Sequence, residues 1–196
     1  MTEASLKQAP IPSDRDLILR FKDGDDNAFR FLFDHYFQMM YHLAFRMTAN
    51  AQDAEEVAQD TFIRLFHARE KIDPESKLST YLYRITTNLA LNKIRDHKRK
   101  ALFSMERLKE ALSWDIASDN SKSPDKEVER LEQETLVQKA LDELPEKQKT
   151  AILLRRYEEL SYEEIAAVMH ISISAVETLL FRARQSLRKK LKFFLD

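Results

Sequence analysis

The 196-residue sequence contains no cysteine, a single glycine and no long apolar run. The absence of cysteine excludes disulfides, thiol catalysis and cysteine-ligated zinc. One glycine, Gly24, is too few for the loops that cradle phosphates, and it disfavours β-rich folds, whose turns use glycine heavily. No apolar run approaches the roughly 18 residues of a membrane span, and the first residues, MTEASLKQAPIPSD, hold no apolar signal core. The sequence therefore predicts a mostly helical, cytoplasmic protein.

Groups that carry catalysis or bind metals are also sparse. The five histidines are scattered and never adopt a metal-ligand spacing such as H-x-x-x-H. No nucleophile–base pair, glycine loop or cluster of ligand residues is visible. We therefore expect a binding protein rather than an enzyme, with no cofactor and no metal.

Charge is segregated along the chain although its formal total is −1. Residues 73–100 carry 7 basic and 3 acidic side chains, and the stretch from Phe181 onward carries six basic side chains against Asp196 alone. Between them, residues 101–138 carry 5 basic and 9 acidic side chains. Two basic segments separated by an acidic one indicate two contacts with a polyanion; ordinary solvated helix faces are the alternative.

The organisation of the chain predicts an all-α fold with two small helical domains joined by a flexible acidic linker. Residues 1–12 are expected to form a loose tail. Residues 13–100 show repeated helical spacing of apolar side chains and are expected to form one bundle, whose last helix ends near Lys100. Residues 101–127 are poor in aliphatic side chains and are interpreted as the linker, and residues 128–196 as the second domain.

The second domain has the pattern of a helix-turn-helix. Ser161-x-x-Glu164 is a capping box that opens one helix, and the tight turn HISIS leads into the basic helix AVETLLFRARQSLRKKL. Its apolar side anchors the helix, while the opposite side presents groups that reach base edges and phosphates. The candidate DNA-binding residues are Ser172, Ser174, Glu177, Thr178, Phe181, Arg182, Arg184 and Arg188.

A second candidate DNA surface lies on the helix expected over residues 78–100. Aromatic side chains beside basic and amide groups suit unstacked bases, which need stacking platforms and neutralisation of their backbone. If both tyrosines of this surface belong to the core, the stacking part of the prediction fails. The candidate residues are Lys77, Tyr81, Tyr83, Arg84, Thr87, Asn88, Arg95, Lys98 and Arg99.

The helix expected over residues 53–66 has an acidic face opposite its apolar face. Asp53, Glu56 and Asp60 follow the spacing i, i+3, i+7. Such a face disfavours DNA and suits docking on a basic protein surface, with a simply solvated face as the alternative.

Three segments in this order resemble a bacterial sigma factor of the extracytoplasmic-function group. They are DAEEVAQDTFIRLF, STYLYRITTNLALNKIRDHKRK and LDELPEKQKTAILLRRYEELSYEEIAAVMHISISAVETLLFRARQSLRKKL. The resemblance covers residues 13–196 and implies that residues 13–100 are sigma domain 2 and residues 128–196 are sigma domain 4.

The resemblance implies partners and roles. Core RNA polymerase would be bound through the clamp helices and flap of its large subunits. The second segment would read and open the minus-ten promoter element, and the helix-turn-helix would read the minus-thirty-five element. An anti-sigma factor is a further implied partner, with no membrane insertion by the chain itself. The implied polymerase-binding residues are Asp53, Glu56, Asp60, Ile63 and Arg64.

One departure from the family concerns the first half of the last helix. Many relatives carry arginines there, whereas this chain has Glu177 and Leu179. Direct readout of guanine by arginine is therefore not expected in that half, and one hypothesis is that promoter choice depends on the minus-ten contacts or on an accessory protein that recruits the factor to DNA.

Three other interpretations stay open from the sequence. The first is a helix-turn-helix regulator that acts without polymerase, which leaves the tyrosine-rich and acidic helices unexplained. The second is a sigma-like factor that needs a targeting protein. The third is a protein-binding adaptor whose basic stretches serve acidic partners.

Overall fold

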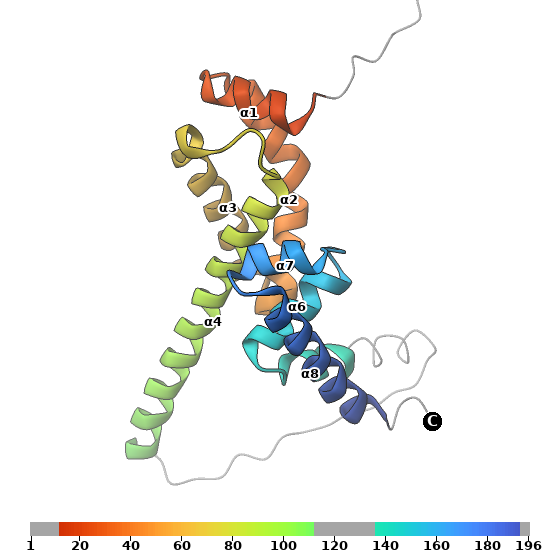
Figure 1. Ribbon diagram of the computed structural model, residues 1–196. Coiled ribbons are helices and arrows are strands. Elements are labelled where there is room, and N and C mark those ends of the chain that lie inside the picture. Colours follow the sequence, from red (N-terminus) through yellow and green to blue (C-terminus); the bar gives the residue numbers. More distant parts are fainter. Residues whose placement is uncertain (1–11, 112–135, 193–196) are drawn as a thin grey trace, which may run out of the picture.

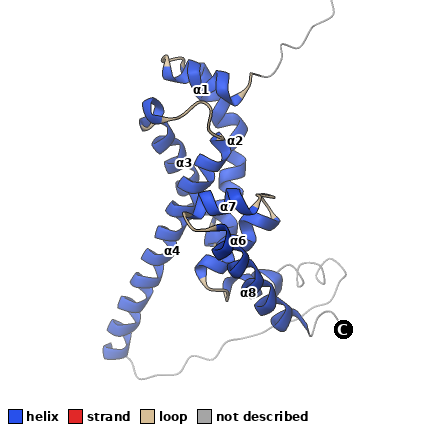
Figure 2. Ribbon diagram, in the orientation of Figure 1, coloured by secondary structure: helices blue, strands red, loops and turns tan. Residues whose placement is uncertain are grey.

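The computed structural model describes residues 12–111 and 136–192, and all regular elements in that part of the chain are helical (Figure 2). Residues 1–11 of the expected tail, and residues 112–127 of the expected linker, lie outside the described residues. The two described parts form an N-terminal and a C-terminal helical unit, as predicted from the spacing of apolar residues.

The N-terminal unit consists of α1 (Asp14–Lys22), α2 (Asp26–Thr48), α3 (Ala51–His67) and α4 (Leu78–Ala111). A short 3₁₀ turn, Arg69–Lys71, lies in the connection between α3 and α4. Figure 1 shows α2, α3 and the first half of α4 running side by side, with α1 across one end.

Side-chain caps explain where the first three helices begin. Ser13, Asp25 and Asn50 each accept a hydrogen bond from a backbone N–H in the turn that follows. Between α1 and α2 the backbone of Gly24 adopts φ +89°, a conformation that glycine enters without the strain of a β-carbon. Ser13 and Gly24 therefore mark the start of α1 and the break between α1 and α2.

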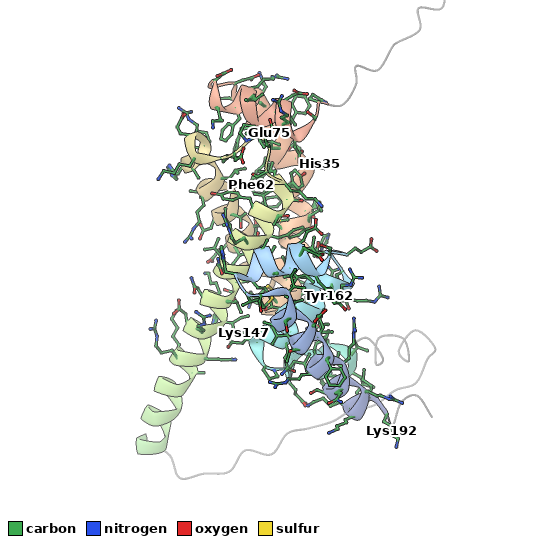
Figure 3. All side chains as sticks on the ribbon, in the orientation of Figure 1. His35, Phe62, Glu75, Lys147, Tyr162 and Lys192 are labelled. Carbon is green, nitrogen blue, oxygen red and sulfur yellow. The ribbon has the colours of Figure 1, made fainter. Side chains whose placement is uncertain are left out.

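The core of the N-terminal unit is rich in phenylalanine. Phe62 of α3, labelled in Figure 3, has its ring centroid 4.9 Å from that of Phe33 and 6.1 Å from that of Phe37, both on α2. A buried hydrogen bond between the hydroxyls of Thr61 and Thr86, 3.0 Å long, joins α3 to α4. These contacts hold α3 and α4 in fixed positions, so that their outer faces are rigid surfaces.

The last helix of this unit is longer than predicted. It was expected to end near Lys100, but α4 continues to Ala111. Residues 101–111, ALFSMERLKEA, contain no glycine or proline and are mostly strong helix formers. The predicted start of the linker at residue 101 is therefore wrong, because local helix propensity extends the helix beyond the bundle.

The C-terminal unit is built from a short helical stretch over residues 136–142 and from α6 (Glu146–Arg156), α7 (Tyr162–Met169) and α8 (Ile173–Leu191). Their apolar sides meet in a small core, which includes the fully buried side chains Leu153, Leu154, Ile165, Val176 and Leu180. No single helix in the described residues is both long and apolar enough to cross a membrane; α7 and α8 pass that test only as a pair bent by 100°.

The two units pack against each other. α7 lies across α4 and α6 lies beside α2, as Figure 1 also shows. Lys149 of α6 donates a 2.8 Å hydrogen bond to the backbone carbonyl of Met47, at the end of α2. This packing places the C-terminal unit directly over part of the N-terminal bundle.

Candidate nucleic-acid interface

The helix-turn-helix predicted in the C-terminal unit is present. The axes of α7 and α8 differ in direction by 100°, within the range typical of the motif. The hydroxyl of Ser161 accepts from the backbone N–H of Glu164, whose carboxylate accepts in return from the backbone N–H of Ser161. His170 ends α7 in the left-handed conformation, φ 52°. The capping box and the turn were both foreseen from sequence, and together they fix the direction in which α8 leaves α7.

The outer face of α8 carries the predicted duplex-reading residues. Val176, Leu180 and Ala183 are buried and anchor the helix against α6 and α7. The side chain of Phe181 is 62 % exposed, the largest exposed fraction among the large hydrophobic residues in the described part of the chain. Every residue predicted for this surface is exposed: Ser172, Ser174, Glu177, Thr178, Phe181, Arg182, Arg184 and Arg188.

The predicted single-strand surface on α4 is only partly exposed. Tyr81 is half-buried, and the guanidinium of Arg84 lies 5.0 Å from the centre of its ring, a cation–π contact. Asn88, Arg95, Lys98 and Arg99 are exposed, as predicted. Tyr81 and Arg84 also line a cavity of about 490 Å³ whose other wall is contributed by Glu163, Glu164 and Ala167 of α7. A hollow with an aromatic ring and a guanidinium can hold an unstacked base.

Two predicted members of this surface are buried, so their placement on an accessible DNA face is wrong for this conformation. Tyr83 is 2 % exposed, and its hydroxyl donates a 2.9 Å hydrogen bond to the carboxylate of Glu158. Thr87 is also 2 % exposed, and its hydroxyl oxygen has no hydrogen-bond partner within the described residues. Helical spacing alone did not reveal that the C-terminal unit covers this side of α4.

Three glutamates of the C-terminal unit hold basic and phenolic groups of the N-terminal unit. Glu164 pairs with Lys77 at the start of α4. Glu146 accepts from Lys98 at 2.8 Å and lies 3.8 Å from Arg95. The third, Glu158, accepts from Tyr83, as described above. Carboxylates therefore pair with Lys77, Arg95 and Lys98, which the sequence analysis predicts to bind DNA.

Glu158 is the most deeply buried of these carboxylates. Arg46 of α2 lies 3.6 Å from it and also stacks 4.3 Å above the ring centre of Tyr157. Burial raises the pKa of Glu158, although the Tyr83 hydrogen bond and the positive charges of Arg46 and His42 act in the opposite direction. The pKa of Glu164 is lowered instead, chiefly by its hydrogen bond with Lys77. The pKa values of these two carboxylates are thus shifted in opposite directions.

The acidic face predicted on α3 divides into a buried and an exposed part. The prediction that Asp53 lies on an exposed face is wrong: it is 8 % exposed, 2.8 Å from His97 and 3.8 Å from Lys93, both on α4. Glu56 is half-buried and pairs with the same Lys93, and this contact lowers the pKa of Glu56.

The exposed part of α3 carries the other three predicted residues. Asp60 and Arg64 are exposed, and the side chain of Ile63 between them is 53 % exposed. Phe66, which the sequence analysis did not select, is 39 % exposed in the next turn. A patch of two apolar residues flanked by opposite charges suits a protein partner.

Comparison with known protein families accounts for both units. The family model for sigma-70 region 2 matches residues 32–100, and the model for sigma-70 region 4 matches residues 134–187. The ECF RNA polymerase sigma factor SigW of Bacillus subtilis is 36 % identical over 178 residues, which cover 89 % of this chain and 95 % of SigW.

The chain belongs to the ECF sigma factors. The RNA polymerase sigma-H factor of Pseudomonas aeruginosa is also similar, with 35 % identity over 91 % of this chain and 94 % of the relative. Among solved structures, CnrH in complex with the cytosolic domain of CnrY matches with a TM-score of 0.66 and 27 % identity, over 91 % of this chain and 97 % of CnrH. The resemblance inferred from the three sequence segments is confirmed.

Sequence reasoning missed the residues that join the two units of this sigma factor. Arg46, Glu146 and Glu158 carried no signal in the sequence, because each is an ordinary charged residue on an amphipathic helix. Glu164 was singled out, but only for its capping role. Packing between units depends on tertiary placement, which local periodicity does not report.

Proposed function

We propose that this ECF sigma factor binds core RNA polymerase, carries it to specific promoters and helps to open the promoter DNA. The observation that carries the proposal is the presence of two different DNA-type surfaces on two separately matched units. One, on α4, combines an aromatic ring with basic groups beside a cavity; the other, on α8, is the outer face of a helix-turn-helix.

We assign the roles by surface. The unit within residues 13–100 binds polymerase through the exposed part of α3, Asp60, Ile63 and Arg64, and binds the minus-ten element through α4. The unit within residues 128–196 binds the minus-thirty-five element through α8. The separation suits the chemistry, since strand capture needs stacking and phosphate contacts whereas duplex reading needs a helix in the major groove.

Opening of the promoter requires no reaction by the sigma factor itself. Bases captured on Tyr81 and Arg84 offset the stacking that the duplex loses. The chain supplies binding free energy and works in the cytoplasm beside the polymerase, which supplies the chemistry of RNA synthesis.

The contacts between the two units have a consequence for this function. Lys77, Arg95 and Lys98 already pair with glutamates, and Tyr83 is buried. The two units must therefore separate before α4 binds DNA fully. An anti-sigma factor that favours the packed arrangement would inhibit the protein, which fits the similarity to a structure in which CnrH is bound by a cytosolic domain.

Run-off transcription tests the proposal. Purified core polymerase is incubated with a library of genomic fragments, with and without this chain. We expect promoter-specific transcripts only when the chain is present. Binding to core without transcripts favours a sigma-like factor that needs a targeting protein, and absence of binding to core favours a helix-turn-helix regulator that acts alone.

A further inference from the structure

The reading helix α8 carries a carboxylate on the side that faces DNA in the proposed function. Glu177 is exposed on the same face as Ser174, Thr178 and Phe181, at the border with the side that carries the buried Val176 and Leu180. It lies in the second turn of α8, in the half of a recognition helix that contacts base edges. An anion at this place approaches a polyanion, so it weakens binding unless a specific donor compensates for it.

No basic side chain lies next to Glu177 on α8. Side chains three and four residues away are its neighbours on a helix, and here these are Ile173, Ser174, Leu180 and Phe181, none of which is basic. Among the described residues, no ion pair or side-chain hydrogen bond involves Glu177. The carboxylate is therefore free to accept hydrogen bonds from a ligand.

The major groove offers few donors to a carboxylate. Guanine presents two acceptors there and thymine presents an acceptor and a methyl group. Adenine presents an amine, but its neighbouring N7 is an acceptor that repels a second carboxylate oxygen. Cytosine presents its N4 amine as a donor without an adjacent acceptor on the same base. A carboxylate in this groove is thus best satisfied by cytosine.

We propose that Glu177 determines upstream promoter specificity by accepting a hydrogen bond from the N4 amine of a cytosine in the minus-thirty-five element. This inference rests on the proposed function. The phenyl ring of Phe181, one turn further along, shields the contact from water and so strengthens it. Arg182, Arg184 and Arg188 lie further along α8, where their charges offset the repulsion between Glu177 and the phosphates.

The experiment selects duplexes with the full-length chain bound to core polymerase. Fragments randomised over the upstream element are recovered and sequenced for the wild type and for Glu177→Ala, Glu177→Gln and Glu177→Arg. We expect the wild type to enrich cytosine at one position. Glu177→Ala should lose that preference, Glu177→Gln should shift it toward adenine and Glu177→Arg toward guanine. Glu159→Gln, which removes one exposed carboxylate from the connection between α6 and α7, is the control and should select the wild-type sequence.

A second measurement isolates the hydrogen bond. The selected cytosine is replaced by a pyrimidin-2-one nucleotide, which lacks only the N4 amine. Wild-type affinity should fall about tenfold, and the affinity of Glu177→Ala should not change. Equal losses for the two proteins, or enrichment of no cytosine by the wild type, would overturn the inference while leaving the proposed function intact. Failure of the polymerase-bound wild type to select any duplex contradicts the proposed function itself, and the inference with it.

Discussion

At the scale of single residues, two carboxylates on one helix have different tasks. Asp53 is buried between Lys93 and His97, whereas Asp60 two turns later is exposed and has no ion pair within the described residues. We expect Asp53→Ala to lower the free energy of unfolding by about 1 kcal/mol, because it removes the carboxylate that contacts Lys93 and His97, whose own side chains stay accessible to water. Asp60→Ala should change it by less than about 0.5 kcal/mol.

Urea denaturation measures the stability of the two variants, and a binding titration measures their affinity for core polymerase. Asp60→Ala should weaken polymerase binding while the fold stays intact. Equal losses of stability in the two variants would contradict the division of α3 into a buried and an exposed part.

A second prediction at the scale of single residues concerns the buried Glu158 and the dependence of stability on pH. Its pKa is raised in the folded protein, so the folded state binds the proton more tightly than the unfolded chain does. The stability that Glu158 contributes is therefore greatest below the ordinary carboxyl pKa and falls as pH rises through the raised value. Glu158→Gln, which does not titrate, should gain stability relative to the wild type over that range of pH.

Thermal unfolding of the two proteins across the carboxyl titration range checks this expectation. The difference between them cancels the contributions of Glu56 and Glu164, whose pKa values are lowered and which act in the opposite direction. If the difference in stability between the two proteins stays constant with pH, burial does not raise the pKa of Glu158.

The assignment of roles to residues shows how far the sequence is informative. All eight predicted residues of α8 are exposed, because one helix with a clear apolar side defines its own outer face. On α4 the same reasoning misplaced Tyr83 and Thr87, and on α3 it misplaced Asp53. These three are covered by other elements, and the position of a covering helix is not encoded in the periodicity of the helix it covers.

At the scale of elements, the capping box of α7 positions the whole reading helix. Replacing Ser161 by alanine removes the acceptor for the backbone N–H of Glu164. We expect a loss of about 1 kcal/mol in the free energy of unfolding. Affinity for promoter duplex should fall as well, because a frayed α7 no longer fixes the direction of α8.

A conservative variant provides the control for this prediction. Ser161→Asp keeps a side-chain oxygen at the cap and should retain most of the stability and the duplex affinity. Circular dichroism during denaturation and a duplex-binding titration give the two readouts. If the alanine and aspartate variants behave alike, the cap does not support the reading helix.

Helix boundaries were predictable where a chemical signal marks them. Ser13, Gly24 and Ser161 are such signals, and the structure places helix ends at all three. The end of α4 had no such signal. Residues 101–111 were interpreted as linker from their position before a polar stretch, although their composition favours a helix. Propensity over the segment itself was the better guide.

At the scale of the whole molecule, the packed arrangement sets an energetic threshold for binding single-stranded DNA. Glu146, Glu158 and Glu164 each contact groups on the face of α4 proposed to bind the minus-ten element. The ion pairs of Glu146 and Glu164 are partly exposed and therefore individually weak, up to about 1 kcal/mol each. Together with the hydrogen bond from Tyr83 to Glu158, they favour the packed state in the free protein and still yield when polymerase binds.

Removing the charges of the two ion-paired glutamates should therefore expose the α4 face. We expect the double variant Glu146→Gln and Glu164→Gln to bind a single-stranded minus-ten oligonucleotide about tenfold more tightly than the wild type, as free protein. Glutamine at position 164 still serves the capping box, so α7 stays intact. Fluorescence anisotropy measures the affinity.

The matched control changes the same number of charges elsewhere. Glu55 and Glu70 are exposed and make no contact between the two units, so their double glutamine variant has the same net charge as the first. Any gain from net charge alone appears equally in both variants, whereas release of the α4 face appears only in the first. With core polymerase bound, the advantage of the first variant should disappear, because the proposed function has the units already separated there. An advantage of the same size in the control, or one that persists on the polymerase, would mean that the glutamates do not mask the minus-ten surface.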